Sequence, residues 1–162
     1  MAKNGRQNTQ IANGAVLDDV NRKLLMELQS DARLSLAELG RRIGLSSPAV
    51  AERLQRLEQS GVIRAYVADV NPRAVGFSLS AIIRVRPAPG QLQNLAAAAR
   101  EKPEVVECHR ITGDDCYIMK AHVRDVEHLE ELIDQFAPLG QSTTSIMQSS
   151  PVPARGLELN DQ

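Results

Sequence analysis

A single stretch of the chain, residues 35–58, limits the fold more than any other. It reads SLAELGRRIGLSSPAVAERLQRLE. Apolar residues recur there at helical spacing in two runs, which are Leu36, Leu39 and Ile43, then Val50, Leu54 and Leu57. Gly44 can adopt the left-handed conformation that ends a helix, and Ser46 or Ser47 before Pro48 can start the next one. The pattern predicts two short helices joined by a tight turn, which is the description of a helix-turn-helix.

The outer face of the second predicted helix has the composition of a surface that enters a DNA groove. It begins with small side chains, which permit close approach to the bases, and continues with two arginines, which can bind guanine or phosphate. The candidate DNA-binding residues are Ser46, Ser47, Pro48, Ala49, Glu52, Arg53, Arg56, Arg41 and Arg42. Arg53 is expected near the base edges, and Gly40 where the two helices pass closely. On spacing alone, a helical hairpin without a DNA function stays an alternative.

The same stretch resembles the DNA-binding half of the Lrp/AsnC family of transcription regulators. The matching pieces are Leu17-Asp18, DAR at 31–33, LAELG at 36–40, GLS at 44–46 and RLQRLE at 53–58. A second block, ECHRITGDDCYIMKAHV at 107–123, extends the resemblance over about residues 17–152. Asn21 and Cys116 depart from the family pattern, which usually has an acid at the first position and often at the second.

The resemblance implies an amino acid effector bound between subunits of the C-terminal domain. The residues that it places there are Gly113, Asp114, Asp115, Tyr117, Thr143 and Ser145. Asp114 or Asp115 could pair with the ammonium of an amino acid, and N–H groups of the turn could hold its carboxylate. A hairpin turn also needs Gly and Asp for its backbone conformation. The Gly113–Asp115 run therefore has two interpretations, a turn alone or a turn with a ligand.

Composition separates a basic N-terminal part from an acidic remainder. Residues 1–65 carry ten Lys+Arg against seven Asp+Glu, and residues 66–162 carry nine against thirteen. A mildly basic head on an acidic body suits a DNA-binding domain joined to a domain that does not bind DNA. Aromatic residues are scarce, which argues against recognition of single strands by base stacking. No apolar run could span a membrane and no signal peptide is visible, so a cytoplasmic location is expected.

Hydrophobic periodicity predicts an α+β chain with five parts. Residues 1–16 are expected to be a disordered tail, 17–64 a winged-type helix-turn-helix domain, 65–76 a linker strand, 77–152 a ferredoxin-like βαββαβ domain for effector binding and oligomerisation, and 153–162 a loose C-terminal tail. Its predicted elements are Phe77–Val85, Gln91–Glu101, Val105–Thr112, Cys116–Val123, Val126–Phe136 and Ser142–Val152. Both helices should cover one sheet face, so the other face is expected to pack on a second subunit.

Metal and enzyme chemistry are not predicted. Cys108, His109, Cys116 and His122 could suggest zinc, but a two-residue turn at Asp114-Asp115 would pair Cys108 with Ala121 and put it on the face opposite His122. His128 is expected to be solvated. No nucleophile–base set and no nucleotide-binding motif is present. No cofactor is expected beyond an amino acid effector.

Two hypotheses of different classes follow. The first is a regulator that binds double-stranded DNA as a homodimer, or as a tetramer or octamer, with half-sites about one helical turn apart or a multiple of it. On this hypothesis Arg53→Ala should weaken specific binding by about 1–3 kcal/mol. The second is a ferredoxin-like small-molecule-binding or enzymatic domain whose helical head binds protein. The two differ in the salt dependence of DNA binding, which only the first predicts.

Overall fold

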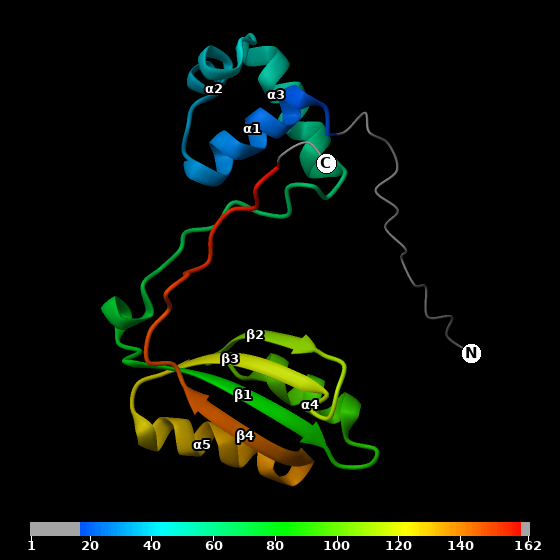
Figure 1. Cartoon of the computed structure of the whole chain (residues 1–162), viewed down its shortest axis with the longest axis vertical. Helices are drawn as coiled ribbons and strands as arrows, with labels where there is room; N and C mark the ends of the chain where they lie inside the picture. The colour runs from blue at the N-terminus through cyan, green and yellow to red at the C-terminus, as the bar shows by residue number, and fades with distance from the viewer. Residues whose placement is uncertain (1–16, 160–162) are drawn as a thin grey trace, which may run out of the picture. The chain divides into compact units, whose positions relative to one another are not determined.

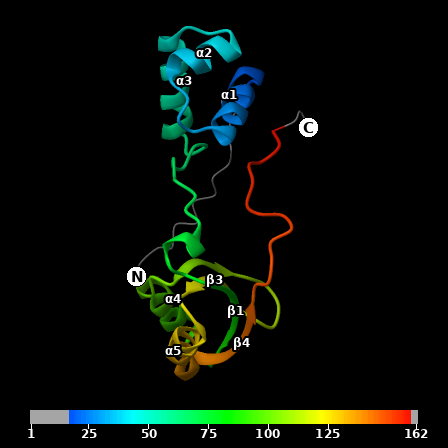
Figure 2. The ribbon, with the colours of Figure 1, turned by 90° about the vertical axis from the view of Figure 1, so that its left-hand side faces the viewer.

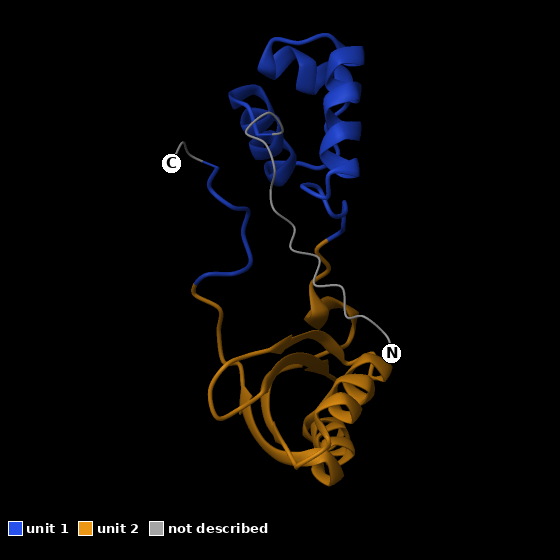
Figure 3. Ribbon diagram, turned by 90° about the vertical axis from the view of Figure 1, so that its right-hand side faces the viewer, with its two compact units in different colours: residues 1–68, 152–162 blue, residues 69–151 orange. Residues whose placement is uncertain are grey.

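The computed structural model describes residues 17–159 and divides the chain into two compact units. Unit 1 comprises residues 1–68 and 152–162, and unit 2 comprises residues 69–151 (Figure 3). The expected disordered tail at residues 1–16 lies outside the described residues. Each unit has its own hydrophobic core.

Unit 1 contains three helices, each of which begins where the sequence supplies a polar residue (Figure 1). They are α1 (Asp19–Ser30), α2 (Leu36–Ile43) and α3 (Ser47–Gln59). The carboxylate of Asp18 accepts the Asn21 N–H at 2.7 Å, and the hydroxyl of Ser35 accepts the Glu38 N–H at 3.2 Å. Ser46 occupies the cap position of α3 but makes no side-chain capping bond. The predicted helix-turn-helix is thereby confirmed, with α1 beginning two residues later than expected.

The core of unit 1 is built from the predicted apolar stripes with one exception. Its buried members are Leu24, Leu25, Leu28, Leu39, Val50 and Leu57. Leu45 packs against them from the turn, as predicted. Leu36, which was expected on the inward face, is 40% exposed at the first position of α2.

The turn between α2 and α3 depends on two glycines. Gly44 has φ +76° and caps α2 in the left-handed conformation. A Cβ on Gly40 would lie 2.4 Å from the carbonyl oxygen of Leu45, whose N–H donates to the Gly40 carbonyl. Gly40 therefore allows α2 to pass close to the backbone of the turn. The close approach is to the turn at Leu45 and not, as expected, to α3.

The linker strand expected at residues 65–76 is not formed. The chain is irregular from residue 64 to residue 71 and then makes the short 3₁₀-helix η1 (Pro72–Val75). Tyr66 and Val67 are 48% and 80% exposed. A strand needs a neighbour for its backbone groups, and this chain offers none here. In the described part of unit 1 there is likewise no wing of β-strands after α3.

Unit 2 has the predicted βαββαβ order. Its elements are β1 (Leu79–Pro87), α4 (Leu92–Glu101), β2 (Val105–Arg110), β3 (Tyr117–Val123), α5 (Val126–Phe136), the 3₁₀-helix η2 (Ala137–Leu139) and β4 (Gly140–Ile146). The strands form one antiparallel sheet in the order β2-β3-β1-β4, which is the ferredoxin-like arrangement. This confirms the α+β fold class.

Both helices of unit 2 cover the same face of the sheet (Figure 2). Along β1, buried residues that face the helices alternate with more exposed residues of the other face. The buried ones are Ala81, Ile83 and Val85. The other face carries Ile82, Arg84, Lys120 and His122, among others, and nothing in unit 2 covers it. We refer to it as the open face.

The β2–β3 hairpin has a longer loop than predicted. Cys108 pairs with Met119, not Ala121, and Ile111 N–H donates to the Cys116 carbonyl, which leaves the four residues 112–115 in the loop. A two-residue change in register preserves the face of every side chain, so Cys108 still lies opposite His122. Among residues 17–159 no group of three or more metal-ligating side chains comes together.

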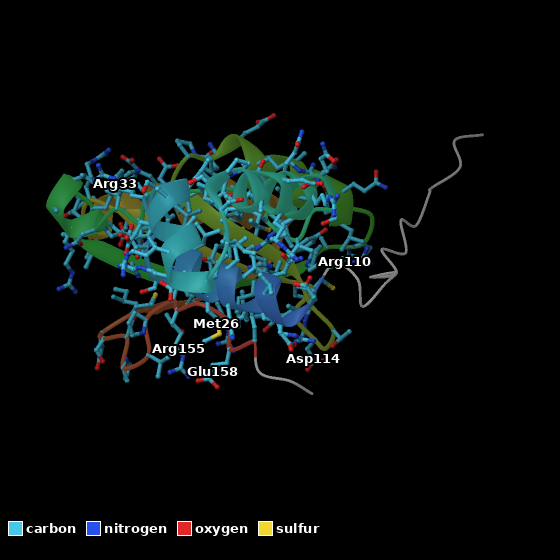
Figure 4. All side chains as sticks on the ribbon, turned by 90° about the horizontal axis from the view of Figure 1, so that it is seen from above. Met26, Arg33, Arg110, Asp114, Arg155 and Glu158 are labelled. Atoms are coloured by element: carbon cyan, nitrogen blue, oxygen red, sulfur yellow. The ribbon has the colours of Figure 1, made fainter. Side chains whose placement is uncertain are left out.

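The C-terminal segment is held against α1 instead of forming a loose tail. The Gln29 side chain accepts the Leu157 N–H at 2.6 Å and donates to the Leu157 carbonyl at 3.1 Å. Leu159 packs on the core of unit 1. Figure 4 labels Met26 of α1 and Arg155 and Glu158 of this segment. The last strand, predicted over Ser142–Val152, ends at Ile146.

No helix among the described residues is long and apolar enough to cross a membrane.

Candidate functional site

The exposed face of α3 carries most of the residues that were predicted to contact DNA. Pro48, Glu52 and Arg56 are exposed, and Ser47 and Ala49 are half-buried at the start of the helix. Ser46 is exposed at the cap position. The first turn therefore presents small side chains and no acidic group, so an approaching phosphate or base edge meets little steric or electrostatic resistance.

Arg53 does not share this outward position. Its Nη1 donates to Asp18 Oδ2 at 2.7 Å and to Asn21 Oδ1 at 2.9 Å. The Arg53 side chain is 29% exposed and joins α3 to the start of α1. Burial opposes ionisation of Asp18, but hydrogen bonds from Arg53 and from the Asn21 N–H outweigh it and lower the Asp18 pKa. The structure thus gives Arg53 a role in holding α1 against α3.

The two arginines of α2 surround a carboxylate. Arg41 binds Glu38 with two hydrogen bonds, of 2.9 and 2.6 Å, and Arg42 binds Glu38 and Glu27, each at 2.7 Å. These hydrogen bonds lower the pKa of Glu38 to about 2. Arg41 keeps a 73% exposed side chain, whereas Arg42 is 39% exposed and carries two acid partners. Arg41 is the better placed of the two for a phosphate.

Arg56 is paired on its own helix with Glu52. Both side chains are well exposed, and an exposed i,i+4 pair contributes only about 0.3–0.5 kcal/mol. A phosphate could replace Glu52 as the partner of Arg56 at little energetic expense. Gln55, which our set of candidates omitted, is also exposed on α3 and has an amide that can bind a base edge. Its exposure was readable from the apolar spacing of the helix.

The effector candidates of the hairpin loop lie at one end of the sheet. Gly113 has φ +110°, so the loop needs a residue without a Cβ there. Arg86 of β1 donates from Nε to the Asp114 carbonyl at 3.0 Å, and its Nη2 lies 3.6 Å from Asp114 Oδ2. The loop is fixed further by the Cys116 N–H, which donates to the Val85 carbonyl at 3.1 Å. Asp115 is half-buried and has no ion pair among residues 17–159.

The remaining effector candidates do not all converge. Thr143 and Ser145 lie together on the open face, opposite Arg84 and Ile82 of β1, as their alternation predicted. Tyr117 lies on the other face, where it is 7% exposed and donates its hydroxyl to the Leu92 carbonyl at 3.2 Å. Its pairing residue on β1 is Val85, which is also buried. Tyr117 therefore supports the helix side of the sheet and is not near Thr143 and Ser145.

One titratable group that we expected in solvent is buried. His128 of α5 is 8% exposed, and its Nε2 lies 3.0 Å from Glu104 Oε1. Its Nδ1 accepts the Arg124 N–H at 3.3 Å, which assigns the ring proton to Nε2. By contrast, the apolar spacing of α5 suggests an inward position for Val126, but this side chain is 52% exposed at the start of the helix.

Comparison with known proteins identifies both units. Residues 17–58 match the family model described as the AsnC-type helix-turn-helix domain, and residues 80–157 match the Lrp/AsnC ligand binding domain. The HTH-type transcriptional regulator LrpC of Bacillus subtilis is 32% identical over 133 residues, which cover 82% of this chain and 92% of that protein. The chain belongs to the Lrp/AsnC family. The leucine-responsive regulatory protein of Escherichia coli K12 is 36% identical, with 75% of this chain and 76% of that protein covered.

A solved structure of an Lrp/AsnC protein extends the likeness to three dimensions. The feast or famine regulatory protein from Mycobacterium tuberculosis, complexed with L-methionine, superposes with a TM-score of 0.82 at 34% identity and covers 87% of this chain and 98% of its own. The chain is therefore a transcriptional regulator of the Lrp/AsnC type in sequence and in fold.

Proposed function

We propose that this Lrp/AsnC protein inserts α3 into the major groove of double-stranded DNA. The observation that carries the proposal is the first turn of α3, which has small outward side chains and no acidic group and is followed by the weakly paired Arg56. Ser46, Ser47, Pro48, Ala49, Glu52 and Gln55 are proposed to lie nearest the bases. Arg56 and Arg41 are proposed to hold phosphates, and Arg42 to assist them. Action on DNA places the protein in the cytoplasm of a bacterial-type cell.

We propose further that two copies act together. The basic excess of the N-terminal part is small, so one head makes few phosphate contacts, and two heads on neighbouring half-sites would add theirs. The open face and the exposed linker residues Tyr66 and Val67 are the surfaces proposed for self-association. Assembly beyond a dimer, to a tetramer or octamer, remains part of this proposal.

An amino acid is the proposed effector, as in the L-methionine complex of the Mycobacterium tuberculosis relative. The Asp115 carboxylate, which has no ion pair within residues 17–159, is proposed to receive the ammonium, and loop N–H groups around Gly113 to receive the carboxylate. Asp114 is held by Arg86 and shapes the loop. Thr143 and Ser145 would contribute hydroxyls only across a subunit contact, and Tyr117 has no direct role.

Fluorescence anisotropy on the protein's own upstream DNA tests the proposal, with salt and a panel of free amino acids as variables. Arg56→Ala should weaken binding to all sequences alike and lower the salt slope by about 1. Asp115→Asn should bind DNA like the parent but no longer respond to the amino acid. DNA binding that is absent at low salt would refute the DNA proposal, and an unchanged amino acid response in the Asp115 variant would refute the effector site.

A further inference from the structure

A groove on the helix side of unit 2 is outside every site described above. It has a volume of about 560 Å³, within the range of small-ligand sites, and it runs between α4 and the β2–β3 hairpin. The lining residues that matter here are Leu92, Ala96, Ala97, Arg100, Arg110 and Tyr117. Those on α4 follow helical spacing, so they form one stripe along the helix.

Two arginines in this groove have no acid partner. Arg100 lies in the last turn of α4, and Arg110 ends β2 beside Tyr117. Within the described part of the chain neither guanidinium forms an ion pair or a hydrogen bond, and no acidic residue lines the groove. Burial raises the pKa of Cys108, and the Arg100 charge counteracts that rise. Cys108 lies two residues before Arg110 on the same side of β2, so the Arg100 charge acts on the strand that carries Arg110.

The space between the arginines is bordered by small apolar side chains and by the amides of Gln93 and Asn94. Ala96 and Ala97 leave room where longer side chains would fill the groove. The Tyr117 hydroxyl is used by the Leu92 carbonyl, so the tyrosine offers its ring and no free donor. A ligand with an anionic group and an apolar body matches this surface, because arginine binds carboxylates with two parallel hydrogen bonds.

We propose that this groove binds a small organic carboxylate that lacks an ammonium group. An amino acid fits poorly, because its ammonium would face two arginines with no carboxylate to receive it. The hairpin loop, with its two aspartates, has the opposite chemistry. Arg110 borders the groove and Asp114 lies in the effector loop, so residues 110–114 connect the two. Both residues are labelled in Figure 4. This inference goes beyond the proposed function and does not depend on DNA binding.

Isothermal titration calorimetry of the full-length protein with 4-methyl-2-oxopentanoate tests it. L-leucine, which differs in carrying an ammonium, and sulfate at equal ionic strength serve as comparison probes. The oxo acid is expected to bind with a Kd below about 1 mM. Arg110→Gln and Arg100→Gln should each weaken it at least about tenfold, because each removes a charged hydrogen-bond donor. Leucine and sulfate should bind the groove at least about tenfold more weakly than the oxo acid.

Two further variants separate the groove from general charge and folding effects. Ala97→Leu keeps both arginines but fills the hollow, and it should also abolish binding. Lys102→Gln removes a charge from the same region outside the groove, where Lys102 contacts Gln135, and it should bind like the parent. The proposal is overturned if the parent shows no saturable binding, if leucine binds equally well and loses that binding in the arginine variants, or if the arginine variants alter only self-association in sedimentation. The last outcome would make the groove a contact for another copy.

Discussion

At the scale of single residues, the position of Arg53 changes what its substitution should do. An arginine one turn from Arg56 on a helix surface invites a role in base recognition. The side chain instead reaches α1, where it satisfies Asp18 and the buried Asn21 together. Asparagine at position 21 can accept this hydrogen bond without adding a second negative charge beside Asp18. The hydrogen bonds from Arg53 to Asp18 and Asn21 thus connect α3 to α1.

Arg53→Ala is therefore expected to lower the stability of unit 1 by about 1–2 kcal/mol, because it removes the hydrogen bonds that Arg53 donates to Asp18 and Asn21. Arg56→Ala should leave stability within about 0.5 kcal/mol of the parent, since it loses only an exposed pair. Urea unfolding followed by circular dichroism measures both. An Arg53 variant that is as stable as the parent but loses DNA specificity would return Arg53 to the base-contacting set.

Low pH should weaken the ion pair between Asp18 and Arg53. The Asp18 pKa is below its ordinary value of 3.8 in the folded chain, so Asp18 contributes stability above about pH 3.8 that is lost as pH falls through the lower folded value. Asp18→Asn retains a good helix cap but removes the charge that Arg53 binds. It should reduce stability at pH 7 and flatten the loss between pH 4 and 3. Unfolding curves at the two pH values check this, and identical slopes for parent and variant would contradict it.

At the scale of elements, the α2–α3 turn has the least tolerance for added atoms. A Cβ at Gly40 would overlap the Leu45 carbonyl, which is backbone and cannot rotate away. Gly44 has a special φ but open space around it. The two glycines are therefore required for different reasons, one by contact and the other by conformation.

Gly40→Ala is expected to destabilise unit 1 by about 1–3 kcal/mol although alanine favours helices, because the turn must shift to admit the methyl group. Gly44→Asn should have a smaller effect, since asparagine tolerates the left-handed conformation. Thermal melts of the two variants decide the order. A Gly40 variant more stable than the Gly44 variant would show that the turn relaxes freely.

The C-terminal segment illustrates why elements at chain ends escape prediction. PARGLEL has no periodicity, and its Pro and Gly suggest an irregular tail. Its order comes from Gln29, an exposed-face residue of α1 that lies 128 positions away and binds both backbone groups of Leu157. No local pattern contains that information. The segment has no regular secondary structure, and it is an ordered part of unit 1 through the Gln29 side chain and the packing of Leu159 on the core.

At the scale of the whole molecule, the open face of unit 2 is the surface proposed for self-association. Ile82 lies on it between Lys120 of β3 and Ser145 of β4. The helix face is fully packed, so the two faces respond differently to charge.

Ile82→Glu is expected to shift the protein toward the monomer while its circular dichroism stays unchanged, because the new charge would be buried only on association. Analytical ultracentrifugation measures the shift. Gln135→Glu adds the same charge to the exposed side of α5 and should leave the assembly as it is. If both variants sediment like the parent, self-association uses a surface other than the open face.

Short-range pattern sufficed for much of this protein. The spacing of Leu39, Val50 and Leu57 and the glycine at 44 predicted the helix-turn-helix, and the apolar runs at 77–85 and 116–123 predicted the strands β1 and β3. These follow from helical and strand periods, which are properties of neighbouring residues.

Contacts between distant residues decided the rest. They turned Arg53 toward Asp18, buried His128 against Glu104, placed Tyr117 away from Thr143, and brought Arg100 and Arg110 to one groove. The linker between the units carries residues that favour a strand, but it forms none without a neighbour. A side chain's partner depends on which elements meet, and that is settled only when the chain packs.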